Sequence, residues 1–193
     1  MITNVLCLDL EPMTQFPPFN GSNRLPNGTT FVALNAWYDG IPDSAADYSH
    51  IVLSGSTCSI NDDVEILPPL EHLINNAIEL KRPIFGICYG HQLLVRCILG
   101  KEHVRRSATP EMGWLPVNVT AGYDEFFVGL PNPFHTFLGH FDEVCTLPQD
   151  WEILANSERC EVQAFVNRKL RLLGCQFHPE MDLAIGNKCF ELS

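Results

Sequence analysis

The sequence predicts an α/β fold, a three-layer domain with a mainly parallel central sheet and an antiparallel extension. Two observations predict it. In the first half of the chain, short apolar runs alternate with segments of helical periodicity, which is typical of parallel strands joined by crossover helices. In the second half, short strand-like segments are separated by polar or proline-containing turns, which is typical of antiparallel strands.

The first half contains three strand candidates before its first helix, the apolar segments 5–8, 31–37 and 50–54. Asp62 and Asp63 are typical of a helix start, and apolar residues then recur at helical spacing over 67–78. Between the first two strands, segment 11–28 contains four prolines and two glycines and is predicted to be a long loop. Such a loop is either a lid or partner surface, or a plain surface insertion.

The segment Pro83–Gly100 predicts a reactive centre. Residues 83–87 form a short apolar run typical of a buried strand, and helical spacing begins at Gly90. Cys88 lies at the corner between them, in a Gly-x-Cys-x-Gly pattern that has the form of a nucleophile elbow, where flanking side chains would clash. The dipole of the following helix favours a thiolate, so Cys88 is a candidate nucleophile. The alternative is a buried structural cysteine.

The remaining elements follow in short segments after Gly100. Strands are expected at 114–120, 134–140, 152–155, 162–167 and 170–177, with one short helix near 124–129. Residues 181–193 are expected to form at most a short helix, interrupted at Gly186. No internal repeat or linker is present, so residues 1–193 are predicted to be a single domain.

The composition disfavours several classes of function. Acidic residues outnumber basic ones by 23 to 12, and the formal net charge of −11 disfavours nucleic acid or an anionic membrane as a partner. A signal peptide and a membrane-spanning run are not evident, so a cytoplasmic protein is expected. The eight cysteines are irregularly spaced and are expected to be reduced. No metal-ligand spacing and no nucleotide-binding glycine motif is found, so neither a metal nor a cofactor is expected.

The last predicted strand ends in His178-Pro-Glu180. In an extended chain, residues two apart point to the same side, so His178 and Glu180 can lie together. A carboxylate beside an imidazole holds its tautomer and supports its charged form, while the imidazole activates a thiol. Because open α/β sheets carry their sites at the carboxyl ends of strands, we expect Cys88, His178 and Glu180 to form a catalytic triad there.

These motifs resemble those of the class I, triad-type glutamine amidotransferases, and the resemblance covers nearly the whole chain. Gly86-Ile-Cys-Tyr-Gly-His-Gln92 is similar to the elbow motif of the family, and Gln176-Phe-His-Pro-Glu180 to its His-x-Glu motif. Between them, Glu111-Met-Gly-Trp114 and Gly139-His-Phe-Asp-Glu-Val144 resemble family signatures in the right order. The most similar branch is a stand-alone one that also resembles γ-glutamyl peptide hydrolases. The family has a flavodoxin-like fold, which the resemblance implies here.

The resemblance implies a glutaminase reaction through a thioester. Cys88 would attack the side-chain amide of glutamine and form a γ-glutamyl thioester. His178 would pass a proton to the departing ammonia and then activate water, with Glu180 orienting the ring. The backbone N–H groups of Gly55 and Tyr89 would form the oxyanion hole.

The resemblance also implies where glutamine binds. Gln92 corresponds to a position that contacts the bound substrate, and the backbone at His140, Phe141 and Asp142 to the stretch that holds its α-amino and α-carboxyl groups. Because the chain has no nucleotide-binding motif, the ammonia is expected to pass to a separate synthetase chain that uses it. Two alternatives remain: a stand-alone γ-glutamyl peptide hydrolase with the same triad, and a non-catalytic regulatory or binding subunit.

Overall fold

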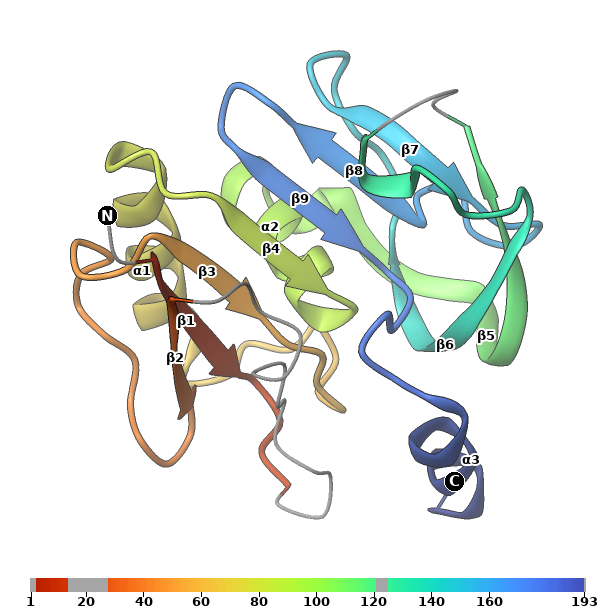
Figure 1. The fold of residues 1–193 in the computed structure, drawn as a ribbon, viewed down its shortest axis with the longest axis horizontal. Helices are drawn as coiled ribbons and strands as arrows, with labels where there is room; N and C mark the ends of the chain where they lie inside the picture. The colour runs from red at the N-terminus through yellow and green to blue at the C-terminus, as the bar shows by residue number, and fades with distance from the viewer. Residues whose placement is uncertain (1–2, 14–27, 121–124, 193) are drawn as a thin grey trace.

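The computed structural model describes residues 3–13, 28–120 and 125–192, and the nine strands in these ranges join in one mixed sheet (Figure 1). The strands are β1 (Thr3–Asp9), β2 (Thr29–Asn35), β3 (His50–Leu53), β4 (Ile84–Ile87), β5 (Val104–Val119), β6 (Phe134–Val144), β7 (Glu152–Asn156), β8 (Ala164–Asn167) and β9 (Leu172–Cys175). The helices are α1 (Leu67–Glu79), α2 (Tyr89–Leu99) and α3 (Leu183–Leu192), with short 3-10 helices η2 (Lys101–His103) and η3 (Glu125–Phe127).

The sheet has a parallel half and an antiparallel half. Its strand order is β2-β1-β3-β4-β9-β8-β7-β5-β6, and the first five of these strands run parallel. The other pairings are antiparallel, which confirms the predicted α/β fold with an antiparallel extension. Strand β9 lies directly beside β4, with Cys175 opposite Ile87, so the carboxyl ends of these two strands meet at one place.

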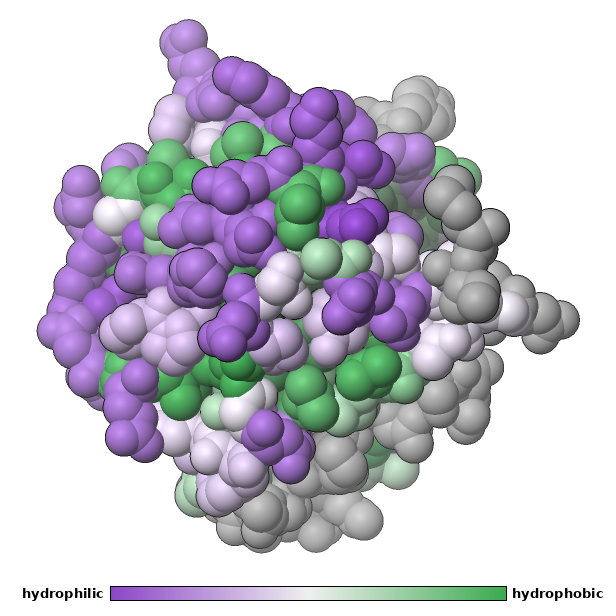
Figure 2. Space-filling view, turned by 90° about the vertical axis from the view of Figure 1, so that its left-hand side faces the viewer, coloured by the Kyte–Doolittle hydropathy of each residue, from purple (hydrophilic) through white to green (hydrophobic). Residues whose placement is uncertain are grey.

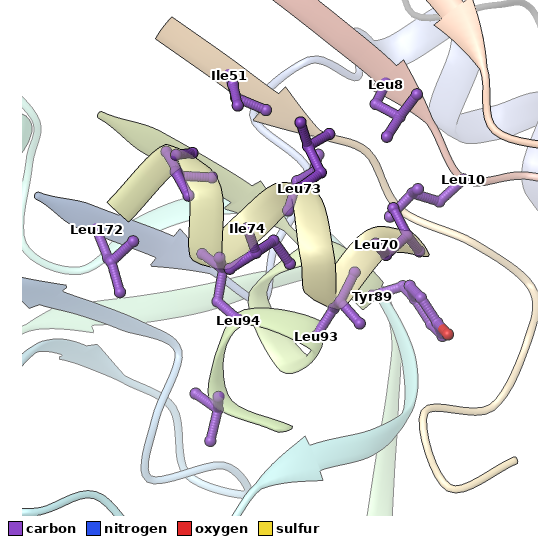
Figure 3. Close-up of a cluster of buried hydrophobic side chains, with 14 of the residues drawn as sticks. Leu8, Leu10, Ile51, Leu70, Leu73, Ile74, Tyr89, Leu93, Leu94 and Leu172 are labelled. Carbon is purple, nitrogen blue, oxygen red and sulfur yellow. The ribbon is translucent and has the colours of Figure 1, made fainter. Parts of the chain in front are cut away.

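The larger core cluster lies between the helices α1 and α2 and the sheet (Figure 3). Leucine and isoleucine side chains of both helices point into it, and they meet strand residues such as Leu8 and Ile51. Each such fully buried side chain contributes about 1.5–3 kcal/mol to the free energy of unfolding. Helix α1 begins at Leu67, later than Asp62 and Asp63, because Pro68 and Pro69 suit a first helical turn whose N–H groups need no partner.

Two predictions about the second half needed correction, and one was confirmed. The short helix expected near 124–129 is the single turn η3. Strand β5 begins at Val104, earlier than predicted, and its long hairpin with β6 changes register between Arg106 and Glu111. Helix α3 continues through Gly186, where a Cβ atom would lie 2.9 Å from the rings of both Trp114 and Phe137. The glycine therefore allows the helix to approach these rings, and the predicted interruption was wrong.

Other expectations concern the surface, the cysteines and the long loop. The seven cysteines whose side chains the structure describes are free thiols. No helix in the described ranges is long and apolar enough to cross a membrane. Figure 2, seen from the left-hand side of Figure 1, shows apolar residues interspersed among many polar ones. Most of the predicted loop 11–28 lies outside the described residues, which include only its ends, 11–13 and Gly28.

Candidate active site

Cys88 lies in a strained turn between β4 and α2. Its backbone has φ 50° and ψ −103°, a combination that an L-residue other than glycine rarely adopts. A Cβ atom at Gly86 would lie 2.5 Å from the backbone of Gly90, and one at Gly90 would lie 2.4 Å from the carbonyl oxygen of Leu53. Both glycines are therefore sterically required, and the predicted elbow is confirmed.

Backbone hydrogen bonds hold this turn against two neighbouring strands. The N–H of Cys88 donates to the carbonyl of Cys175 at 2.8 Å, at the end of β9, and the N–H of Gly90 donates to the carbonyl of Ser54 at 3.1 Å, just after β3. Such surrounding bonds are what allows a residue to persist in a strained conformation that costs on the order of 1–3 kcal/mol.

His178 and Glu180 lie where the chain continues beyond β9. The N–H of His178 donates to the carbonyl of Phe137 at 2.9 Å, and its ring Nδ1 lies 2.7 Å from Glu180 Oε1. The ring also interacts with the side chain of Cys88. Burial disfavours the charged ring, but the charges of Glu180 and Cys88 outweigh this and raise the pKa of His178 well above its ordinary value. The structure thus brings the three predicted triad residues together.

The two residues predicted for an oxyanion hole flank the same thiol. A Cβ atom at Gly55 would lie 3.0 Å from His178 Cε1 and 3.5 Å from Cys88 Cβ, so the loop after β3 passes directly over the site. Tyr89 is the first residue of α2, and its N–H therefore has no acceptor within the helix. In the described part of the chain, no group accepts a hydrogen bond from the backbone N–H of Gly55 or of Tyr89.

A buried carboxylate that was not predicted from the sequence holds the loop after β3, which contains Gly55. Glu11 is 8% exposed, and its two oxygens accept hydrogen bonds from the N–H of Thr57 at 2.7 Å and from the Thr57 hydroxyl at 3.0 Å. The loop after β3 is thereby tied to the end of β1. The only sequence signal for this contact was an acidic residue directly after a buried strand.

The β6 residues predicted to bind substrate follow directly after the residue that contacts the thiol, and the side chains of Asp142 and Phe141 contact other residues. Gly139, which precedes them in β6, places its carbonyl oxygen 3.7 Å from Cys88 Sγ. The Asp142 carboxylate accepts hydrogen bonds from Ser59 and Asn61, and Phe141 is half exposed with Arg106 over its ring at 5.0 Å.

Gln176, which is held by Gln92, forms a second contact with the thiol. The buried Gln92 donates from Nε2 to the carbonyl of Asp142 at 2.7 Å and to Gln176 Oε1 at 3.0 Å. Gln176 in turn places its Nε2 3.6 Å from Cys88 Sγ. Gln176 was part of the motif that the sequence showed, but no role was predicted for it. It precedes His178 by two residues, so the rule that paired His178 with Glu180 also predicts that it points toward the site.

His140 belongs to a separate buried cluster. Its Nε2 lies 3.0 Å from Glu111 Oε2, which also accepts hydrogen bonds from Ser157 and Gln163. Its Nδ1 donates to the carbonyl of Asp142 at 3.0 Å. Glu111, His140 and Cys160 form the group in the described ranges that could hold a metal ion, with ligand atoms within 4.8 Å of one another. The carboxylate oxygen in it already has three hydrogen-bonding partners, so the cluster is complete without a metal.

Four other buried groups, three thiols and one imidazole, are held in their neutral forms. Burial raises the pKa of Cys97 and Cys160 to about 12 and that of Cys175 well above its ordinary value, so these thiols stay protonated at neutral pH. Burial also lowers the pKa of His91 to about 3, so this ring is neutral. Of these groups, Cys175 lies in the same core cluster as Cys88, and as a protonated thiol it is not a competing nucleophile.

Comparisons with known proteins agree with this geometry. Residues 25–189 match the family described as glutamine amidotransferase class-I. The chain is 37% identical over 135 residues to a subunit of the glutamine-hydrolysing GMP synthase of Sulfurisphaera tokodaii, which covers 70% of this chain and 69% of the relative. It is 36% identical over 128 residues to the corresponding subunit from Pyrococcus abyssi, which covers 66% of each chain. The chain therefore spans about two thirds of the length of these relatives.

A solved structure supports the same assignment. The fold is similar to that of a glutamine amidotransferase from Methylobacillus flagellatus, with a TM-score of 0.86 and 25% identity. That similarity covers 100% of this chain and 76% of the other.

Proposed function

The chain belongs to the class-I glutamine amidotransferase family, and from this we propose that it hydrolyses the side-chain amide of glutamine with Cys88, His178 and Glu180. The observation that carries the proposal is the convergence of the three side chains. An imidazole held by a carboxylate at 2.7 Å contacts a thiol at the strained corner of a strand–helix turn. Three such groups are the parts that nucleophilic acyl transfer requires.

The proposed reaction has two steps. The Cys88 thiolate attacks the amide carbon of glutamine, and the C–N bond breaks as charged His178 gives its proton to the departing ammonia. Water then attacks the γ-glutamyl thioester while His178 takes a proton from it, and the C–S bond breaks to release glutamate. The raised pKa of His178 supports this proposal, because it keeps the ring charged and ready to donate when the thiolate attacks.

We assign the backbone N–H groups of Gly55 and Tyr89 to the developing oxyanion. Both flank Cys88, and neither donates to an acceptor in the described part of the chain. Losing one such donor typically lowers kcat by about 10²–10³-fold. By holding Thr57, Glu11 keeps the Gly55 loop in place.

Glutamine is proposed to bind against β6 and the start of α2. The backbone of residues 140–142 would hold its α-amino and α-carboxyl groups, since the side chains of His140 and Asp142 are engaged elsewhere. Gln92 would contact the substrate through Oε1, because its Nε2 is occupied by Asp142 and Gln176. Phe141, half exposed, would line the edge of the site.

The ammonia is proposed to pass to a separate synthetase chain. The relatives from Sulfurisphaera tokodaii and Pyrococcus abyssi are each named as one subunit of a GMP synthase, so a second, synthetase subunit of such an enzyme is the acceptor to test first. We further propose that residues 1–193 act as one domain, in the cytoplasm, with no cofactor in the glutaminase reaction.

The experiment that tests the function measures glutamate release by the purified chain from glutamine and, separately, from γ-glutamyl dipeptides, with Cys88→Ala as control. We expect higher kcat/KM for glutamine and no release by Cys88→Ala. Preferred cleavage of the dipeptides would replace the proposal by a stand-alone γ-glutamyl hydrolase. Failure of Cys88 to react with a glutamine-like electrophile, together with no release from either substrate, would leave the non-catalytic subunit.

A further inference from the structure

Gln176 is a fully buried polar residue next to the thiol. It follows β9 directly, is 0% exposed, and donates its backbone N–H to the carbonyl of Gln163 at 2.8 Å. Its side-chain Nε2 lies 3.6 Å from Cys88 Sγ. A buried amide needs hydrogen-bonding partners for both of its ends, so this contact is one that the fold has to keep.

The other end of the amide is held by Gln92. Gln92 Nε2 donates to Gln176 Oε1 at 3.0 Å and to the backbone carbonyl of Asp142 at 2.7 Å. His140 Nδ1 donates to the same carbonyl at 3.0 Å. A continuous set of hydrogen bonds therefore runs from the backbone of β6 to the thiol.

The direction of these hydrogen bonds is fixed by the backbone. A carbonyl oxygen can only accept, so Gln92 must turn its NH₂ group toward Asp142. The same NH₂ group then faces Gln176, which must present its own oxygen to it. That leaves the NH₂ group of Gln176 facing Cys88, and the amide cannot flip without placing donor against donor at one end.

We propose that Gln176 is a positioning residue that donates an N–H to the sulfur of Cys88 and stabilises its thiolate. The inference rests on the proposed role of Cys88 as nucleophile. Cys88 is only 5% exposed, so water can solvate a thiolate there poorly, and a fixed donor replaces that solvation. Hydrolysis of the thioester returns negative charge to the sulfur, so the same donor assists the second step.

The test is the pH dependence of Cys88 alkylation by iodoacetamide, followed by mass spectrometry of the peptide that contains Cys88. Gln176→Met removes the donor at nearly constant volume, and we expect the pH midpoint of alkylation to rise by about one to two units. We also expect kcat for glutamine to fall about tenfold with KM within about twofold. A midpoint equal to that of the wild type would overturn the proposal.

Gln163→Met is the matched control. Gln163 is also 0% exposed, but its amide donates to Glu111 and Ser157, away from the thiol. We expect it to lower stability and to leave the alkylation midpoint in place. If both variants shift the midpoint equally, the effect is a general one of core damage and the proposal fails.

A measurement on the unaltered side chain covers the case in which Gln176→Met does not fold. In ¹⁵N-labelled wild-type protein, the side-chain amide resonance of Gln176 should titrate with the midpoint of Cys88 alkylation, and it should not titrate in Cys88→Ala. A resonance that does not respond to pH in the wild type would contradict the donation. The alkylation and resonance measurements do not use glutamine, so failure of the glutaminase proposal can be told apart from failure of this one.

Discussion

The described part of the chain contains two histidine–carboxylate pairs, and they differ in which groups the ring nitrogens face. In the pair His178–Glu180, one ring nitrogen is bound to the carboxylate at 2.7 Å and the ring also reaches the Cys88 thiol. In the pair His140–Glu111, one nitrogen faces the carboxylate at 3.0 Å and the other donates to the carbonyl of Asp142.

The difference shows that a histidine held by a carboxylate is not by itself a catalytic element. The ring of His140 has both nitrogens occupied by acceptors that do not react, in a cluster closed by Ser157 and Gln163. The ring of His178 has one nitrogen bound to Glu180, and the ring also interacts with the nucleophile Cys88. The pair His178–Glu180 is therefore expected to affect the rate, through the ring of His178. The pair His140–Glu111 is expected to affect stability.

The largest expected effect is that of His178→Asn on the rate. General acid–base catalysis by the ring is lost, so kcat for glutamine should fall by about 10²–10⁴-fold. Steady-state kinetics and thermal unfolding of the same preparation measure the effect and check the fold. A variant that keeps more than a tenth of the wild-type kcat would show that the two pairs do not differ as described.

The next largest effect is that of Glu111→Gln on stability. It removes the charge from a pair whose side chains are only 1% and 3% exposed, and breaking such a buried pair typically lowers the free energy of unfolding by about 3–5 kcal/mol. Urea unfolding measures this change. In the fraction that remains folded, we expect kcat to change by less than about threefold. A large loss of kcat at unchanged stability would assign the pair to the active site instead.

Glu180→Gln should have an intermediate effect on the rate. The ring of His178 keeps a hydrogen-bonding partner but loses the charge that supports its protonated form, so kcat should fall by about 10–100-fold. The pH profile of kcat/KM should also shift, because the pKa of His178 falls without Glu180. An unchanged profile would mean that the carboxylate does not act on the ring.

The smallest effect is the dependence of stability on pH. The folded pKa of His178 is raised above its unfolded value of about 6.5, so its contribution to stability is complete below pH 6.5 and is lost as the pH rises through the folded pKa. The stability difference between wild type and His178→Asn should therefore shrink above pH 6.5, by at most about 1.4 kcal/mol per unit. Chemical unfolding at a series of pH values tests it, and a constant difference would contradict the raised pKa.

Local chemistry made part of the site predictable from the sequence. The two glycines around Cys88 and the change from strand to helical spacing predicted the elbow, and the spacing of two between His178 and Glu180 predicted their contact. The same spacing applied to Gln176 but was not used. Glu11 could not be found in this way, because its partner Thr57 lies on another loop and no local pattern joins them.

The fold was predictable where pattern and packing agree. The parallel strands up to β4 are apolar runs, and they were found. Residues 104–113 carry charged and polar side chains, and they extend β5 only because β6 pairs with them across an irregular register. The course of α3 through Gly186 likewise depends on two distant rings, Trp114 and Phe137. Both features come from tertiary contacts that the local sequence does not encode.

The positive φ of Cys88 lowers stability at the position where the proposed function needs a side chain. Glycine would adopt this backbone without strain, whereas cysteine carries a strain on the order of 1–3 kcal/mol there. The buried side chain offsets part of this strain, because it is the hydrogen-bonding partner of Gln176. A cysteine in this strained conformation is therefore explained by the chemistry of its thiol and not by the stability of the turn.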